Sequence, residues 1–152
     1  MKLNWKSIGI TSVLIVILCG VIIVELSLFI SGPARKYEGQ IDDEMARIQE
    51  KYKNIKNMDR HVFYYTTYVG EDTKTIVWFN VKGKAIVNRK KNTLKIEEAK
   101  QVAQSTYGAK EVEVTLGYGY DNPVYVIQSD VGSILLDYDT LKEVYYLKEG
   151  DV

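Results

Sequence analysis

An unbroken apolar run near the amino terminus is the strongest pattern in this 152-residue chain. As a helix that rises 1.5 Å per residue, residues 8–30 span about 34 Å, which is enough to cross a hydrocarbon core about 30 Å thick. The pattern predicts a transmembrane anchor at residues 8–30 that contacts membrane lipid, preceded by a short tail at residues 1–7. The weakly polar or charged interruptions are Thr11, Ser12, Cys19, Gly20, Glu25 and Ser27.

A cleaved signal peptide is the alternative interpretation of this run. The apolar part of a signal peptide is normally about 7–15 residues long and is followed by small residues at the cleavage site. The run here is longer, and the segment Gly32-Pro33-Ala34 is a poor cleavage site. We therefore expect an uncleaved, single-pass anchor in the cell membrane.

The orientation of the anchor is predicted from its flanks. Lys2 and Lys6 precede the run, and Arg35 and Lys36 follow it, so the positive charges on the two sides nearly balance. The short basic tail on one side and a complete domain on the other favour a cytoplasmic N-terminus. We expect the C-terminal domain to be extracytoplasmic.

After the run, the apolar positions change to helical spacing. Gly32-Pro33 is expected to end the anchor, and charged residues then alternate with apolar ones. The apolar residues recur at spacings of four and three, which places them on one face of a helix that can pack on a sheet. These residues are Ile41, Met45, Ile48, Tyr52 and Ile55.

The rest of the chain carries strand patterns and a second helix. Aromatic and β-branched residues predict strands at 61–69, 74–81 and 85–88. Residues 96–107 have a helical apolar face, and Gly108 stands where a left-handed C-cap belongs. Four further strands follow from a period-two alternation and from turn residues, at 111–120, 124–128, 134–138 and 144–147.

The element order therefore predicts an α+β fold in which a helix followed by an antiparallel meander occurs twice. Each meander can curl around its helix and bury one face. We expect a first unit with its linking helix at residues 31–91 and a second unit at residues 92–152. The glycines 117 and 119 alternate with aromatics within a strand, and they are expected to leave room for a helix or a neighbouring backbone.

Composition limits the kinds of partner. The formal net charge is +0 and the pI is near 6.6, so no strong field recruits nucleic acid, and we expect none as a partner. The chain has 12 Tyr but only 3 Phe and 2 Trp. Aromatic residues are enriched at interfaces, so Tyr64, Tyr65, Tyr68 and Trp78 are candidate partner-binding residues. The alternative is that they pack the sheet, and strand alternation lets only about half of them face inward.

Residue types that carry catalysis are sparse. Cys19 lies in the apolar run, and His61, the single histidine, opens a predicted strand where a surface role is expected. A tight zinc site needs several Cys or His ligands. We therefore expect a non-enzyme with no catalytic residue, cofactor or metal. Asp137 and Asp139 flank Tyr138, where weak cation binding is one reading and the shaping of a turn is the favoured one.

Several motifs together carry a family resemblance. They are the Tyr-rich strand ending in Val69-Gly70, the segment Ile76-Val77-Trp78-Phe79-Asn80-Val81, Ile96-Glu97-Glu98-Ala99, and Leu136-Asp137-Tyr138-Asp139-Thr140. With the tail, the anchor and the linking helix, the chain resembles the TseB-like cell wall elongation regulators of Gram-positive bacteria. The soluble part of that family consists of two PepSY-like, cystatin-like units.

The chain departs from the family pattern at two positions. Lys95 stands where the family commonly has a Ser or Thr N-cap, so the side-chain bond of a capping box is expected to be missing. Leu141 stands where the terminal turn usually has Gly. Both departures put the local geometry of the second unit in question.

The resemblance implies an interaction protein that regulates peptidoglycan elongation. The implied partner is a class B penicillin-binding protein, or another envelope protein, and no catalytic residues come with the family. The alternative, suggested by general PepSY resemblance, is an inhibitor or modulator of an extracytoplasmic peptidase. A hydrolase would require an activity that disappears on His61→Ala or on substitution of a carboxylate.

Overall fold

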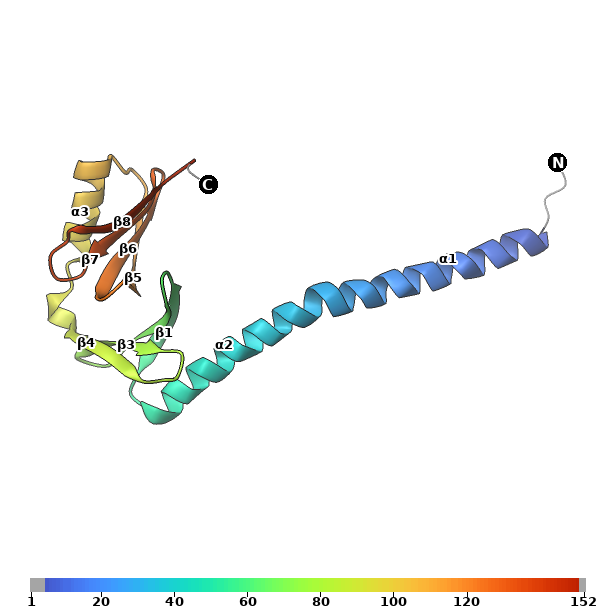
Figure 1. Ribbon diagram of the computed structural model, residues 1–152, viewed down its shortest axis with the longest axis horizontal. Helices are drawn as coiled ribbons and strands as arrows, with labels where there is room; N and C mark the ends of the chain where they lie inside the picture. The colour runs from blue at the N-terminus through green and yellow to red at the C-terminus, as the bar shows by residue number, and fades with distance from the viewer. Residues whose placement is uncertain (1–4, 151–152) are drawn as a thin grey trace. The chain divides into compact units, whose positions relative to one another are not determined.

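The computed structural model describes residues 5–150, apart from the side chains of residues 5–7 and 30–33. The chain begins with α1 (Trp5–Leu26), continues through a π-helical turn (Ser27–Ser31), and enters α2 (Gly32–Lys51) (Figure 1). Gly32-Pro33, which was expected to end the anchor, does not interrupt the helix. Proline lacks an amide hydrogen, so its α-helical bond is lost, and the wider π turn immediately before it accommodates this defect without ending the helix.

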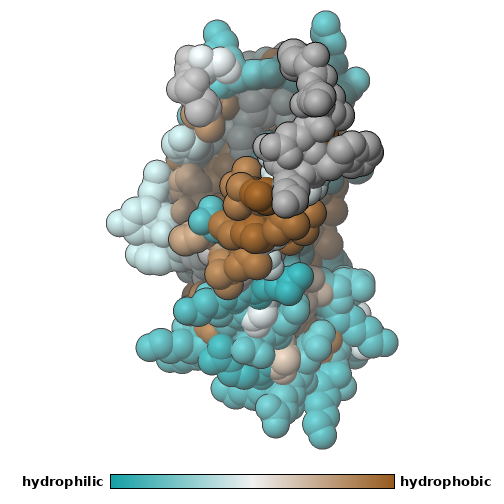
Figure 2. All heavy atoms as spheres, turned by 90° about the vertical axis from the view of Figure 1, so that its right-hand side faces the viewer, coloured by the Kyte–Doolittle hydropathy of each residue, from teal (hydrophilic) through white to brown (hydrophobic). Residues whose placement is uncertain are grey.

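The side chains at residues 8–29, in α1 and the turn after it, are exposed. Large apolar residues between Ile8 and Phe29 leave from 43% to 77% of their surface accessible. Figure 2 shows hydrophobic residues in brown at the surface. By length and composition, this helix can cross a membrane, and a signal sequence would pass the same test.

The chain divides into two units, one that ends at Asp43 and one that begins at Glu44. The second unit holds the last part of α2 and both sheets. The boundary expected from the sequence, between residues 91 and 92, falls in a short 3-10 turn (Lys91–Thr93) within this second unit. The following paragraphs concern the second unit alone.

The first sheet is an antiparallel meander of four strands. These are β1 (Lys56–Val62), β2 (Thr66–Glu71), β3 (Thr75–Asn80) and β4 (Ala85–Lys90), in that order across the sheet. The expected strand at 61–69 is wrong, because the chain reverses at residues 63–65 between β1 and β2. The turn consists of three aromatic residues. Because aromatic residues are common in strands, the sequence pattern predicted a continuous strand here.

The end of α2 packs on this sheet, as the helical spacing predicted. Ile48 is fully buried, and the ring of Tyr52, just past the helix end, lies 4.9 Å from the ring of Phe79. The hydroxyl of Tyr68 donates a hydrogen bond of 2.7 Å to the carboxylate of Glu44. Burial and this bond raise the pKa of Tyr68 to about 12, so the phenol stays a donor at neutral pH.

The second sheet follows α3 (Ile96–Tyr107), which has the predicted bounds and ends at Gly108 with φ of 74°. Lys95 makes no side-chain cap, as predicted, and its backbone N–H instead donates to the hydroxyl of Tyr125 at 2.8 Å. Leu141 adopts a φ of 58°, a left-handed conformation that favours glycine. The strands are β5 (Val112–Tyr118), β6 (Pro123–Ser129), β7 (Gly132–Asp137) and β8 (Glu143–Lys148), also in sequence order.

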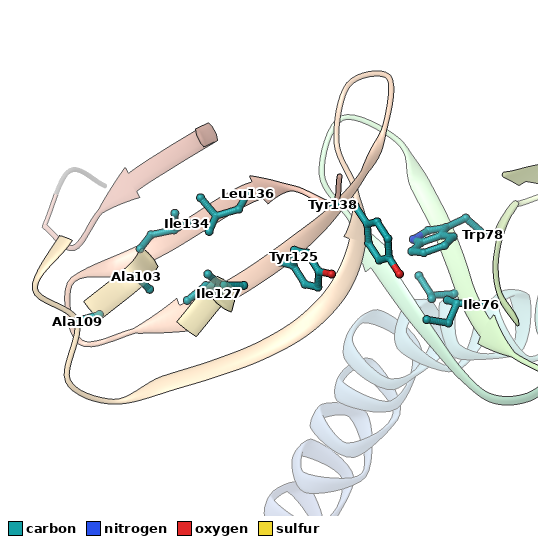
Figure 3. Close-up of a cluster of buried hydrophobic side chains, with 11 residues drawn as sticks. Ile76, Trp78, Ala103, Ala109, Tyr125, Ile127, Ile134, Leu136 and Tyr138 are labelled. Carbon is teal, nitrogen blue, oxygen red and sulfur yellow. The ribbon is translucent and has the colours of Figure 1, made fainter. Parts of the chain in front are cut away.

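One hydrophobic core joins the two sheets. Trp78 and Ile76 of the first sheet belong to the same buried cluster as Tyr125 and Tyr138 of the second, and Figure 3 shows Tyr138 between Tyr125 and Trp78. Ala103 of α3 covers the far part of the cluster. The α+β class and the long apolar helix are therefore confirmed, with two four-stranded antiparallel sheets.

Burial of Ile48 predicts how strongly α2 is held to the first sheet. We expect Ile48→Ala to lower the free energy of unfolding by about 2–5 kcal/mol, because it removes buried methyl groups and leaves a cavity. Urea denaturation of the full chain in detergent, followed by tryptophan fluorescence, measures this change. Ile86→Ala is the matched control: Ile86 is 43% exposed, and its loss should change stability by less than about 1 kcal/mol. Equal effects of both substitutions would contradict this packing.

Candidate functional site

Two side chains of the first sheet hold one peptide group of β5. The indole N–H of Trp78 donates to the carbonyl oxygen of Gly117 at 2.8 Å. The N–H of the same peptide group, which belongs to Tyr118, donates to Nδ1 of His61 at 3.2 Å. The Gly117–Tyr118 peptide is therefore bonded at both its polar atoms, and this fixes the end of β5 against the first sheet.

Gly117 allows this close approach. A Cβ atom at this position would lie 2.6 Å from the ring atoms Cε1 and Nδ1 of His61 and 2.6 Å from a methyl group of Val126. The expectation that this glycine makes room was therefore right in kind, but the neighbour is a side chain rather than a helix or a backbone. No local sequence pattern indicates that His61, 56 positions earlier, is that neighbour.

A series of rings continues from this junction into the second sheet. The ring of Trp78 meets that of Tyr138 edge-on at 5.7 Å, and Tyr138 stacks on Tyr125 at 5.1 Å and 9°. The hydroxyl of Tyr138 shares a 3.1 Å hydrogen bond with that of Thr93. These contacts keep large tyrosines buried with their polar tips satisfied.

The terminal turn adds an ion pair to the same junction. Arg89 of β4 bonds both carboxylate oxygens of Asp139, the closer at 2.8 Å. Asp137 accepts bonds from the amide and hydroxyl of Thr140 at 2.8 and 2.7 Å. Burial acts to raise the pKa of Asp137, but these bonds and one from Asn122 outweigh it and lower the pKa. Asp137 thus shapes the turn, as favoured from the sequence, and Asp139 pairs with an arginine.

The structure separates the four candidate partner-binding residues. Tyr68 and Trp78 are 0% exposed, the first against α2 and the second at the junction. Tyr64 and Tyr65 lie in the turn between β1 and β2 and are 64% and 54% exposed. Only these last two present their rings to a partner in this structure.

Tyr64 and Tyr65 line a groove whose walls come from both sheets. Its volume is about 630 Å³. The first sheet and its β1–β2 turn supply the two tyrosines together with polar and aliphatic residues. The last residue of β5 and the segment after it supply two more tyrosines and a carboxylate. The lining residues are Tyr64, Tyr65, Thr66, Thr67, Asn80, Val81, Ile86, Tyr118, Tyr120 and Asp121.

The aromatic rings in and behind the groove support one another. Tyr64 lies 4.7 Å from Tyr65 at 86° and 5.4 Å from Tyr120 at 58°. Behind them, Phe63 contacts Tyr120 at 5.1 Å and Tyr145 of β8 at 5.2 Å. The exposed rings therefore contact one another at large interplanar angles. Through Phe63 they are also connected to Tyr145 of the second sheet.

Sequence reasoning missed Tyr120, Val81 and Ile86 as members of this surface. All three are large and at least 36% exposed. Residue 120 was predicted to continue a strand, but β5 ends at Tyr118 and frees it to face the turn at residues 63–65. The usable signal was an uninterrupted aromatic run at residues 63–65, which is unusual for a strand with one solvent face.

The histidine is occupied by a structural contact. His61 is partly buried, and its Nδ1 accepts the Tyr118 N–H, so that atom must be unprotonated. Burial lowers the pKa of His61, and the negative charge of Asp59 offsets this in part. Among the residues that the structure describes, no group of three or more His, Cys, Asp or Glu side chains is arranged to hold a metal ion.

Comparison with known proteins adds nothing to this picture: no protein-family model, curated protein or solved structure matches the chain.

The His61 contact predicts a pH-dependent stability. The pKa of His61 in the folded state lies below its ordinary value of 6.5, so the unfolded state binds a proton at a higher pH than the folded state does. The contribution of unprotonated His61 to the free energy of unfolding is complete above pH 6.5. It is lost as the pH falls through the pKa that His61 has in the folded state. Urea denaturation at several values between about pH 5 and 7.5 should show stability rising with pH.

His61→Asn provides the control for this dependence, because its amide oxygen can still accept a bond and does not titrate. Since His61 is the chain's single histidine, the slope in this window should largely disappear in the variant. An unchanged slope would show that other groups cause it.

Proposed function

We propose that this chain is a membrane-anchored interaction protein that binds another envelope protein through the aromatic groove. The observation that carries the proposal is the exposure of Tyr64, Tyr65 and Tyr120 together in one groove. Aromatic side chains at the surface cost little conformational entropy to bury, and they dominate the energetics of many interfaces. A stable domain has no need to leave three of them accessible side by side.

The anchor in this proposal is the apolar segment at residues 8–30. It crosses the membrane once, with residues 1–7 in the cytoplasm and the domain that follows outside. The exposed apolar surface of α1 supports the proposal, because such surface is stable in lipid and costly in water. Anchoring would also hold the groove at a restricted distance from the membrane and from other membrane proteins.

The proposed partner is a class B penicillin-binding protein, and the proposed role is regulation of peptidoglycan elongation. This part rests on the resemblance to the TseB-like family, whose PepSY-like units would correspond to the two four-stranded sheets. The buried Trp78 and the Asp137 turn lie in two of the motifs that carry the resemblance. Trp78 bonds to Gly117 at the junction and Asp137 shapes the terminal turn, so both residues have structural roles.

Substitution of the groove tyrosines tests the site. We expect Tyr64→Ala and Tyr120→Ala each to weaken co-purification of penicillin-binding proteins from solubilised membranes by about tenfold or more, since interface aromatics often contribute about 2 kcal/mol. Tyr37→Ala is the control, because Tyr37 is 52% exposed and does not line the groove. Fluorescent penicillin labelling of the captured material measures the change.

Two outcomes would contradict the proposal. Capture that is equal for the groove variants and the control would remove the groove from the interface. Absence of every penicillin-binding protein, combined with inhibition of an envelope peptidase by the purified chain, would favour the peptidase modulator instead.

The proposed topology is tested by cysteine labelling. In a Cys19→Ser background, Lys84→Cys should react with a membrane-impermeant maleimide in intact cells, because residue 84 lies on an exposed turn of the proposed outer domain. A cysteine in place of Asn4 should react only after lysis. The reverse pattern, or a mature protein that mass spectrometry shows to lack residues 1–30, would contradict the anchored arrangement.

A further inference from the structure

The aromatic groove carries a negative charge as well as rings. Asp121 lines it and is exposed, next to Tyr118 and Tyr120. The nearby guanidinium of Arg89 is engaged by Asp139 at 2.8 Å. Lys82 and Lys84 lie on the turn after Val81, and neither is among the residues that line the groove. In the described part of the chain, the lining of this groove therefore has one formal charge, which is negative.

The polar atoms around this carboxylate are partly committed to the fold. The side-chain oxygen of Asn80 accepts the N–H groups of Lys82 and Lys84, both at 3.0 Å. The hydroxyl of Tyr118 donates to the backbone carbonyl of Asp121 at 2.7 Å and so leaves the carboxylate itself accessible. Burial and, to a smaller extent, the negative charge of Asp121 raise the pKa of Tyr118, whereas the positive charge of Arg89 lowers it.

We propose that this groove binds a cationic side chain, a lysine or arginine of the partner that lies over the exposed rings of Tyr64, Tyr65 and Tyr120 and pairs with Asp121. The identity of the partner rests on the proposed function, whereas the preference for a cation rests on the groove alone. The negative charge of Asp121 beside exposed rings favours this occupant over a purely apolar or an anionic one.

The physical basis is the quadrupole of the rings. The face of a tyrosine ring is negative, and a cation within about 6 Å of its centre is attracted by about 0.5–2 kcal/mol. Tyr64 meets Tyr65 edge-on at 4.7 Å and lies 5.4 Å from Tyr120 at 58°, so the rings touch one another, and a cation would lie over their solvent-facing sides and not between them. The Asp121 carboxylate, which lines the same groove, adds a direct ion pair.

The test uses the full chain in detergent micelles and small probes, so that no partner is needed. Butylammonium and butylguanidinium carry the charges of lysine and arginine on a comparable alkyl stem, whereas butanol and butyrate are the neutral and anionic controls. NMR of selectively labelled tyrosine rings measures the binding. We expect the two cations to shift the resonances of Tyr64, Tyr65 and Tyr120 at concentrations at which butanol and butyrate do not.

Two groove variants and one control make the test specific. Asp121→Asn removes the charge and keeps the shape, and Tyr120→Leu removes a ring and keeps an apolar side chain. Each should weaken the binding of butylguanidinium by roughly fivefold. Tyr37→Leu should leave it unchanged, because Tyr37 is outside the groove.

Three results would overturn the inference. Butanol that binds as tightly as the cations would make the groove merely apolar. A proline-rich peptide that binds equally to the chain and to Asp121→Asn, while the cations do not bind, would make it a site for an extended apolar segment. If the cations shift no groove resonance, the cation site is excluded, even if a penicillin-binding protein is captured. If the cations bind but no penicillin-binding protein is captured, only the proposed function is contradicted.

Discussion

The folded domain depends on two hydrogen bonds, which join the side chains of Trp78 and His61 to the Gly117–Tyr118 peptide group. A two-sheet arrangement of this kind has a weak point where the end of one meander meets the edge of the other, because edge strands leave backbone groups to be satisfied. Here the indole of Trp78 and the imidazole of His61 satisfy both polar atoms of one peptide, and the missing side chain of Gly117 lets them approach. The same contact holds the end of β5, whose last residue, Tyr118, lines the groove, against the first sheet.

The tyrosines divide into two classes with different physical roles. Tyr68, Tyr125 and Tyr138 are buried, and each hydroxyl has a partner: Glu44, the Lys95 backbone and Thr93. Their rings supply core area, and their hydroxyls connect elements that are distant in sequence. Tyr64 and Tyr120 instead remain exposed outside the strands, where they contact each other and Tyr120 also contacts Phe63. The same residue type thus serves packing and a proposed binding surface.

The residues first considered for chemistry have structural contacts. The single histidine accepts a backbone hydrogen bond, Asp137 shapes a turn, and Asp139 pairs with Arg89. The groove brings exposed aromatic rings together with one carboxylate. In the proposed setting, the anchor confines this groove to the neighbourhood of a membrane, where even a modest affinity for one side chain gains from the high local concentration of membrane partners.

The sequence by itself determined the features whose causes are local. The apolar run, the α3 helix with Gly108 at its end, and the alternation in β5 all follow from periodicity or from a single residue's conformational freedom. Tertiary structure decided the break of the expected 61–69 strand, because the turn has no glycine or proline and is held by rings from the second sheet. It also decided that Trp78 is buried while Tyr64 is exposed, since both are strong strand formers and only the surfaces facing them differ. The groove could not be foreseen for the same reason: its members are separated by as many as 57 positions, from Tyr64 to Asp121, and no local pattern records which distant side chains will meet.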